Sequence, residues 1–499
     1  MAHLVVCCDG TWQSVAAHSN VSRLHAAIVP AAGDPQPLYV RGVGVSRNPV
    51  DVLRGGLTGA GLDRSITDGY RWLVRQFRRG DRISVFGFSR GAYTARSLAG
   101  MIGRVGLVDG NGLDAGGIDD AVARAYARYR TARAAPDDTS WSAGLRFAYR
   151  AGDPDIPVAF IGVWDTVGAL GIPAYVGVPD LTGSRKRYEF LDVVLNRHIP
   201  HARHAVALDE MRGPFRPTLW RDVASGQDVQ QVWFPGDHSD VGGGHADKGL
   251  SDGALDWMMR EATDAVGLVF DRGRFRGFRP DAGGALHGGW RGPAAAAMEV
   301  VMQPRPRAVP RVDHRQPDPR VAASAYERQQ ASGYRRTRTL SRPGDDATVT
   351  VPADQVWTAT GLWLEPGRYR ITASGRWQSA GHPSGPDGES SGLHHSGGTL
   401  SRLVGIGQNA LRRLLNNPDA EVLGARREPA LPWLSLIAAV ANEETDAAGK
   451  TRHEDQHLLV GTGATARVER PGYLHAFPND AWGFYGNNRG SVRLTVTRL

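Results

Sequence analysis

The sequence has almost no cysteine: among its 499 residues only Cys7 and Cys8 occur, side by side in an apolar run. Neighbouring cysteines rarely pair, which excludes a disulfide-based secreted fold and favours a reducing compartment. No run approaches the roughly 18 apolar residues of a transmembrane helix. The short apolar run that follows Met1 ends at Asp9 and is too short for a signal peptide. We therefore expect a protein that is cytoplasmic at synthesis, and any export would use a route without a signal peptide.

Lysine is also scarce, because arginine replaces it at almost every basic position. The net charge of +8 is uneven, since residues 305–342 contain ten arginines against three acidic residues. Such a window could bind a nucleic acid or a membrane surface. The same window is rich in proline, so we interpret it as an irregular, solvated connector. No nucleic-acid partner is expected, whereas contact with a membrane surface stays open.

Apolar patterning divides the chain into three zones. Residues 1–270 alternate short apolar runs with helical periodicity, which predicts an α/β fold with a mostly parallel sheet and helices on both faces. Residues 271–345 are rich in Gly, Pro and Arg and predict a linker or a wrapping segment. Residues 346–499 contain short alternating runs separated by turn residues, which predicts a β-sandwich.

The first zone contains five predicted strands: Leu4–Cys8, Pro37–Arg41, Arg82–Phe86, Val158–Trp164 and Val229–Phe234. Helical patterns cover residues 66–77, 95–102 and 118–133. Strands that alternate with helices in this way place their carboxyl ends at one edge of a sheet.

Residues 87–91 (GFSRG) match the G-x-S-x-G pattern of a nucleophilic serine on a sharp strand-to-helix turn. The pattern alone is weak, because residues 249–253 and 388–392 match it too in a chain with 63 glycines. Only Ser89 follows a β run and precedes a helical pattern, which is the context that this turn requires. We predict Ser89 as the nucleophile, and the alternative is an ordinary tight turn.

A serine nucleophile needs a histidine base and an acid that orients it, and α/β hydrolases carry them in the order Ser, acid, His. Asp165 ends the fourth predicted strand, and His238 follows the fifth. We predict His238 as the base and Asp165 as the acid. Asp237 and Asp240, beside the histidine, are rival acids.

Backbone N–H groups near Ser89 can hold a developing oxyanion. Arg90 offers one at the start of the predicted helix, and Gly10 or Thr11, after the first strand, offers the other. The alternative for this loop is an Asx turn. Carboxylates at or just after strand ends could also bind a divalent metal ion; these are Asp9, Asp165, Asp237 and Asp240. A metal-dependent phosphoesterase is therefore an alternative function.

Several ordered motifs together resemble a known family. They are CDGTW at 8–12, GFSRGA at 87–92, VWDTVG at 163–168, RHAVALDE at 203–210, GDHSDVGGG at 236–244 and LDWM at 255–258. Over residues 1–340 the set resembles the type VI secretion phospholipase effector-like α/β-hydrolase family. The resemblance implies a lipolytic enzyme with a lipid or ester substrate and a triad of Ser89, Asp165 and His238, which needs no cofactor for its serine chemistry.

Residues 479–491 (NDAWGFYGNNRGS) gather oxygen ligands before a last predicted strand, which suits Ca²⁺; the alternative is a β-hairpin with Asx turns. Together with residues 357–377, this loop resembles the bacterial calcium-dependent galactophilic lectin of the PA-I type. The resemblance implies Ca²⁺ held by the side chains of Asp480, Asn487 and Asn488 and the carbonyl of Phe484. It also implies contacts of Asp480 and Asn487 with a galactose-type glycan.

The sequence thus predicts a serine esterase or lipase followed by a lectin-like domain. One rival is a catalytically inactive carbohydrate-binding or toxin-associated module. The other is the metal-dependent phosphoesterase.

Overall fold

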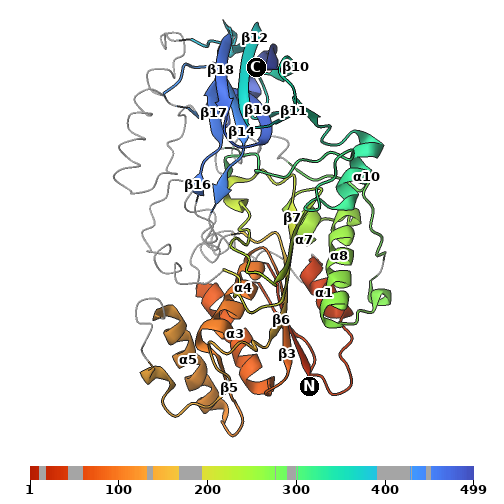
Figure 1. The fold of residues 1–499 in the computed structure, drawn as a ribbon, viewed down its shortest axis with the longest axis vertical. Helices are drawn as coiled ribbons and strands as arrows, with labels where there is room; N and C mark the ends of the chain where they lie inside the picture. The colour runs from red at the N-terminus through yellow and green to blue at the C-terminus, as the bar shows by residue number, and fades with distance from the viewer. Residues whose placement is uncertain are drawn as a thin grey trace.

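The computed structural model of the chain describes residues 1–10, 18–42, 60–131, 139–167, 194–275, 277–288, 299, 302–389, 427–428, 430–445 and 451–499. These residues form a parallel sheet flanked by helices, followed along the chain by two largely antiparallel sheets (Figure 1). No helix in the described ranges is long and apolar enough to cross a membrane.

The first sheet has six strands in the order β2-β1-β3-β6-β7-β8, and every neighbouring pair is parallel. Parallel pairing brings the carboxyl ends of these strands to one edge of the sheet, where side chains that follow different strands can meet. The strands are β1 (His3–Cys8), β2 (Leu38–Val40), β3 (Arg82–Phe88), β6 (Val158–Trp164), β7 (His201–Ala207) and β8 (Asp228–Phe234).

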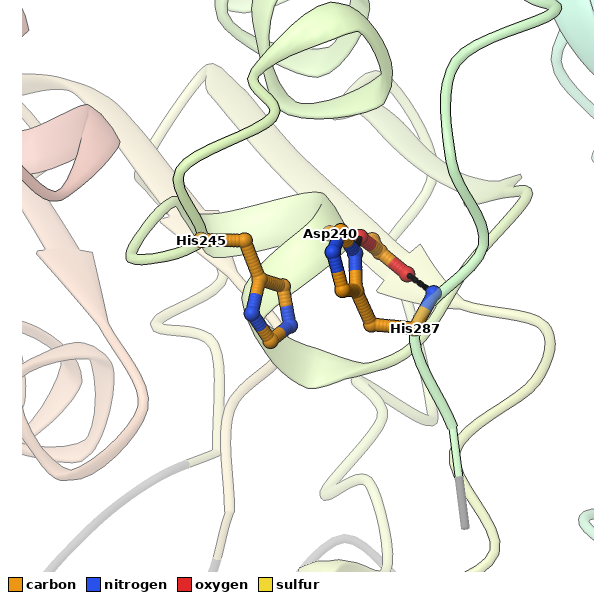
Figure 2. A group of neighbouring side chains, drawn as sticks. All are labelled: Asp240, His245 and His287. Carbon is orange, nitrogen blue, oxygen red and sulfur yellow. Dashed lines mark hydrogen bonds and ion pairs between the residues drawn. The ribbon is translucent and has the colours of Figure 1, made fainter.

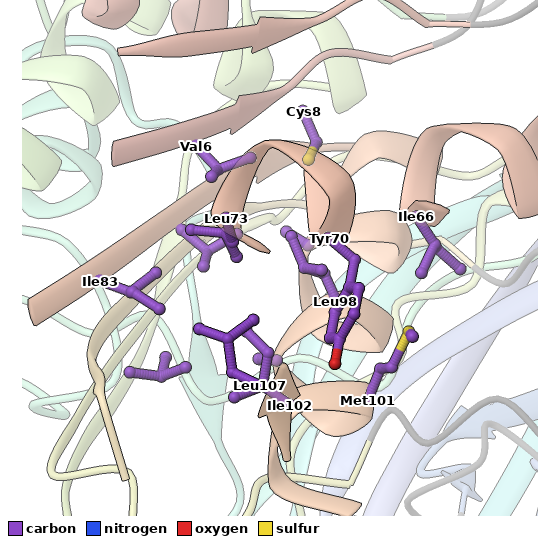
Figure 3. Close-up of a cluster of buried hydrophobic side chains, with 14 of the residues drawn as sticks. Val6, Cys8, Ile66, Tyr70, Leu73, Ile83, Leu98, Met101, Ile102 and Leu107 are labelled. Atoms are coloured by element: carbon purple, nitrogen blue, oxygen red, sulfur yellow. The ribbon is translucent and has the colours of Figure 1, made fainter. Parts of the chain in front are cut away.

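Helices cover both faces of this sheet, because strand residues point alternately to either side. In β1, Leu4 and Val6 pack in one apolar cluster, and Val5 and Cys7 pack in another. The first cluster includes side chains of α3 (Ala60–Gln76), α4 (Arg90–Val105) and α5 (Ala115–Thr131), and Figure 3 shows part of it. The second includes α1 (Asn20–Ala27) and α8 (Gly249–Val266), which lie on the opposite side in Figure 1. A short antiparallel pair of β4 (Leu107–Val108) and β5 (Phe147–Tyr149), with α5 between them in the chain, adds to the first side.

The C-terminal part contains two sheets of five strands each that share one apolar cluster. Val351, Ile371 and Leu494 reach this cluster from one sheet, and Leu362 and Leu474 reach it from the other. One sheet contains β10 (Asp346–Pro352), β12 (Gly367–Ser379), β13 (His382–Ser384), β18 (Gly463–Val468) and β20 (Asn488–Arg498). The other contains β9 (Arg338–Thr339), β11 (Thr358–Leu364), β14 (Leu436–Ala441), β17 (Gln456–Leu459) and β19 (Gly472–Pro478), and a separate ribbon pairs β15 (Glu444–Thr445) with β16 (Thr451–His453).

The sequence predicted residues 271–345 as a linker or a wrapping segment, and the described part of this segment is packed and not a solvated connector. It carries the helix α10 (Ala323–Ser332). Val309, Val312 and Val321 are buried in a cluster that also contains Trp233 of β8 and Tyr473 of β19. The segment therefore contacts both the parallel sheet and the C-terminal sheets, and its arginines are not all exposed.

The five strands predicted in the first zone are present, and the parallel sheet confirms the predicted α/β class. β7 is an additional strand that the sequence analysis did not predict. It lies between β6 and β8, so the two strands that lead to Asp165 and His238 are separated by one strand.

Candidate active site

Ser89 lies in the sharp turn between β3 and α4. Its backbone has φ 59° and ψ −125°, a conformation that costs energy for a residue with a side chain and that is concentrated at functional sites. Gly87 and Gly91 make the turn possible, since a Cβ on Gly91 would lie 2.2 Å from the carbonyl oxygen of Cys8. A Cβ on Gly87 would lie 2.5 Å from the carbonyl oxygen of Gly91. Both glycines of the G-x-S-x-G pattern are therefore required by close backbone contacts.

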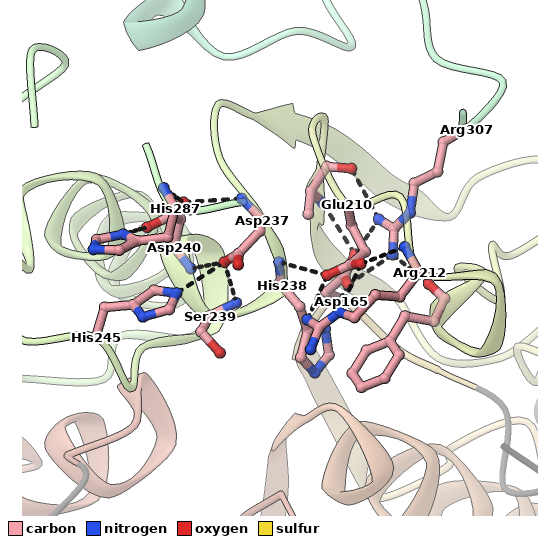
Figure 4. A network of polar contacts seen from close by, with 12 residues as sticks. Asp165, Glu210, Arg212, Asp237, His238, Ser239, Asp240, His245, His287 and Arg307 are labelled. Carbon is pink, nitrogen blue, oxygen red and sulfur yellow. Dashed lines mark hydrogen bonds and ion pairs between the residues drawn. The ribbon is translucent and has the colours of Figure 1, made fainter. Parts of the chain in front are cut away.

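Asp165 and His238 meet at the same edge of the sheet. Asp165 follows β6, and His238 follows β8 as the first residue of the short helix α7 (His238–Gly242). The Nδ1 atom of His238 lies 2.6 Å from Oδ2 of Asp165 (Figure 4). Asp165, like Ser89, has a positive φ, at 33°. This contact leaves Nε2 as the ring nitrogen that can exchange a proton with another group.

The imidazole of His238 is held between two aromatic rings. The ring of Phe88 lies 4.6 Å from it, centroid to centroid, and the ring of Phe215 lies 4.8 Å away, edge to face. Because Phe88 immediately precedes Ser89, this packing places the imidazole beside the serine turn. Within the described residues no hydrogen bond joins the Ser89 hydroxyl to His238. Such bonds are often long without substrate and tighten when it binds.

Arg307 clamps the carboxylate of Asp165 and was not predicted from the sequence. Its two terminal nitrogens lie 2.7 Å from Oδ1 and 3.0 Å from Oδ2 of Asp165. The N–H of Ala207 also donates to Oδ1, at 3.0 Å. Burial would raise the pKa of Asp165, but Arg307 and His238 outweigh it and hold this pKa well below its usual range. The fully buried Asp165 is therefore ionised at neutral pH.

The two rival acids have other partners. Asp237 caps α7 by accepting the N–H groups of Ser239 and Asp240, each at 2.9 Å. Asp240 accepts the N–H of Asp237 at 3.0 Å and contacts Nδ1 of His287 at 2.7 Å. Neither carboxylate has a hydrogen bond with the imidazole of His238 among the contacts of the described residues (Figure 4). Geometry thus favours Asp165 over both.

The predicted oxyanion donors have different surroundings. Gly10 lies against the serine turn, since a Cβ built on it would be 3.2 Å from the Cβ of Ser89. Its N–H donates to Oδ1 of Asp9 at 2.7 Å and would have to leave that carboxylate to hold an oxyanion. Arg90 is the first residue of α4, where backbone N–H groups have no partner within the helix. Thr11 lies outside the described residues.

Two other histidines, His201 and His204, lie within β7. His204 is fully buried and its Nε2 accepts the N–H of Thr166 at 3.0 Å. Burial lowers the pKa of His204 to about 3, so it stays neutral at ordinary pH. His201 contacts Asp228 at 3.1 Å, at the opposite end of the strand. Neither ring has a place beside Ser89 comparable to that of His238.

The four strand-end carboxylates do not form a shared metal site. Asp9 accepts the hydroxyls of Ser19, at 2.6 Å, and of Tyr39. Asp165 is bound by Arg307 and His238. In the described part of the chain, the only group of three or more His, Cys, Asp or Glu side chains close enough to hold one ion is Asp240, His245 and His287.

The predicted calcium residues lie together at the end of the C-terminal part. Asp480 and Asn488 are fully buried, and the Asn488 amide donates to Oδ2 of Asp480 at 2.8 Å. Oδ1 of Asn488 is buried without a hydrogen-bond partner among the described residues. Phe484 and Asn487 are exposed, and Oδ1 of Asn487 accepts the Ser379 hydroxyl at 3.3 Å. An unpartnered oxygen beside a carboxylate is compatible with the chemistry of a Ca²⁺ ligand set.

Comparison with known proteins identifies the family of the first zone. Residues 2–261, just over half of the chain, match the family described as "T6SS, Phospholipase effector Tle1-like, catalytic domain". The chain therefore belongs to the type VI secretion Tle1-like phospholipase effector family. The match covers Ser89, Asp165 and His238 but ends before His287 and Arg307.

Individual relatives are more distant. An uncharacterized protein of Saccharomyces cerevisiae, YEL023C, is 29% identical over 235 residues, which cover 43% of this chain and 32% of the yeast protein. The chain thus spans about a third of the length of this curated relative. A structure of the Tle1 effector bound to the VgrG spike matches 49% of this chain and 51% of its own, with 18% identity and a TM-score of 0.29. A PllA-like lectin, the EclA N-terminal domain, matches 30% of this chain and 95% of its own, with 19% identity and a TM-score of 0.19. Likenesses with such TM-scores establish neither fold nor function for this chain.

Proposed function

We propose that the chain hydrolyses lipid esters, phospholipids being the first class to test, through a triad of Ser89, His238 and Asp165. The observation that carries this proposal is the 2.6 Å contact between His238 and a buried, ionised Asp165, on a ring packed beside the serine turn. Membership of a phospholipase effector family supports the lipid class of substrate.

In this mechanism Oγ of Ser89 attacks the ester carbonyl carbon, and its proton passes to Nε2 of His238. Asp165 fixes the imidazole through Nδ1 and stabilises the imidazolium that forms. The N–H of Arg90, and a second N–H from the loop after β1, hold the oxyanion. His238 then returns the proton to the leaving alcohol, and water attacks the acyl-enzyme by the same route.

Covalent labelling tests the serine mechanism without knowledge of the substrate. A fluorophosphonate should phosphonylate Ser89: Oγ forms a bond to phosphorus, fluoride leaves, and the proton goes to His238. Mass spectrometry of peptides should locate the adduct on Ser89 and not on Ser251, the serine of a second G-x-S-x-G match. Ser251 is a suitable comparison because it is buried within α8 and its hydroxyl donates to the carbonyl of Lys248. An unlabelled Ser89 in folded protein would contradict the proposal.

A second proposal concerns the C-terminal part, in which Asp480, Asn487, Asn488 and the carbonyl of Phe484 bind Ca²⁺. The unpartnered Oδ1 of Asn488 beside Asp480 favours it. A bound ion would let Asp480 and Asn487 contact a galactose-type glycan, and such binding would bring the enzyme to a glycan-bearing surface.

Calorimetry tests the calcium proposal. Wild type should bind one Ca²⁺, and Asn487→Ala and Asp480→Ala should each lower the affinity by at least about tenfold, because each removes an oxygen ligand. Asn487 is exposed, so its replacement should leave the fold intact. Asp354→Ala, an exposed carboxylate of the same part, is the control and should bind as wild type does. Equal binding by all four proteins would remove the proposal.

A further inference from the structure

Two histidines and a buried aspartate meet on the side of α7 away from Asp165. The rings of His245 and His287 are stacked, with centroids 3.8 Å apart and planes inclined by 16°. Nδ1 of His287 lies 2.7 Å from Oδ1 of Asp240. One potential ligand atom from each side chain lies within 4.8 Å of the others. Figure 2 shows the three side chains gathered at α7, with His287 on a separate segment of the chain.

The charges around this group favour a cation. The Asp240 side chain is 1% exposed, and within the described part of the chain no arginine or lysine forms an ion pair with it. The Asp237 carboxylate lies 3.1 Å from Nε2 of His245. Two carboxylates and two imidazoles therefore share a small volume, and Arg212, whose charge acts on Asp237 and His245, is itself paired with Glu210 at 2.5 Å.

The group is also accessible. The side chains of His245 and His287 are 28% and 33% exposed, so an ion can enter from solvent while Asp240 lies behind them. The backbone on both sides is fixed, because the N–H of His287 donates to Oδ2 of Asp240 at 3.0 Å. The group thus meets two requirements of a metal site, nitrogen and oxygen ligand atoms and a path for the ion to enter.

We propose that Asp240, His245 and His287 bind a divalent transition metal ion of the zinc class. One nitrogen from each imidazole and one oxygen of Asp240 supply three ligands, and Asp237 or water supplies the fourth. Tetrahedral zinc with bonds of about 2.0–2.1 Å places its ligands about 3.4 Å apart. The contact between Nδ1 of His287 and Oδ1 of Asp240, at 2.7 Å, must therefore lengthen, while ligand atoms up to 4.8 Å apart must come closer together.

The ion would join two segments that are distant in the sequence. Asp240 belongs to α7, the helix that begins at His238, whereas His287 lies beyond α8 and beyond the matched family region. The site touches none of the reacting groups, so its role is to fix the segment carrying His287 onto α7. This inference does not depend on the serine mechanism and can fail or hold separately from it.

Cobalt titration tests the site directly. Full-length protein without a polyhistidine tag is freed of metal with a chelator and titrated with Co²⁺. Wild type should bind one equivalent with visible absorption of tetrahedral cobalt, which Zn²⁺ then displaces. Zn²⁺ should also raise the Tm of wild type by a few degrees, because it binds the folded state. His245→Ala and His287→Ala should each lose the absorption and the Tm shift.

Two further variants keep the result interpretable. His198→Ala removes an exposed histidine elsewhere and should bind cobalt as wild type does. His287→Asn places an amide nitrogen where Nδ1 lies and can still donate to Asp240, so it should fold normally and yet bind cobalt at least tenfold more weakly. Failure of wild type to bind one equivalent would overturn the proposal, as would wild-type cobalt affinity in folded His287→Asn.

Discussion

Ser89→Ala is expected to reduce the turnover of any ester that the wild type cleaves by about a millionfold, the scale seen when a triad nucleophile is removed. The reason is that alanine leaves no oxygen to attack the carbonyl, while the sharp turn and the helix after it remain. The measurement is kcat/KM on a short-chain ester and on phospholipid vesicles. Purity matters here, because traces of another esterase would mimic residual activity.

Ser251→Ala is the matched control for that experiment. Ser251 has the same pattern of flanking glycines but is buried in α8, so its replacement should leave kcat within about twofold of wild type. Activity that survives Ser89→Ala and disappears with a chelator would favour the metal-dependent phosphoesterase instead. Absence of activity in the wild type on every ester would favour an inactive carbohydrate-binding module.

Asp165→Asn is expected to lower kcat by about ten-thousandfold, the effect of the same change in a triad acid elsewhere. The amide cannot stabilise the imidazolium, and it can hold the ring in the wrong tautomer. It also leaves Arg307 buried beside a neutral group, which destabilises the fold. Circular dichroism and Tm should therefore accompany the kinetics, so that the loss is measured on folded protein.

Asp237→Asn tests whether Asp237, the rival acid beside His238, orients the imidazole instead of Asp165. Asparagine caps a helix about as well as aspartate, so α7 should remain intact and kcat should fall by less than about tenfold. The reverse order, with Asp237→Asn the more damaging change, would reassign the acid. The same comparison with Asp240→Asn covers the other rival.

Short apolar runs separated by helical segments were sufficient to predict the parallel sheet, because most of its strands are continuous apolar segments. β7 was missed because it contains Arg203 and His204, which are typical of surfaces. Both are buried with partners that lie far away in the sequence: Arg203 pairs with Glu261 at 2.6 Å, and His204 accepts the Thr166 N–H. A local pattern carries no information about such partners.

The candidate triad of Ser89, Asp165 and His238 could be predicted from the sequence because each residue follows an apolar strand. The contact of Arg307 with Asp165 could not be predicted. It is one of ten arginines in a proline-rich window, and nothing in its neighbours distinguishes the one that reaches Asp165. Likewise, the sequence suggested Gly10 as an oxyanion donor, but it could not indicate that the Gly10 N–H donates to Asp9.

Because Arg307 lies later in the chain than Asp165, the ion pair between them can form only after residue 307 has been synthesised. Ser89, Asp165 and His238 all leave the ribosome before residue 307 does. Until Arg307 docks, the buried charge of Asp165 is offset by His238 and the N–H of Ala207 without a permanent positive charge. A nascent chain that ends at residue 270 would carry all three residues of the proposed triad without the cation that holds Asp165. Under the proposed mechanism the site would therefore be completed late, after the segment that leads into the C-terminal sheets has been made, and partial chains should hydrolyse esters more slowly than the full chain.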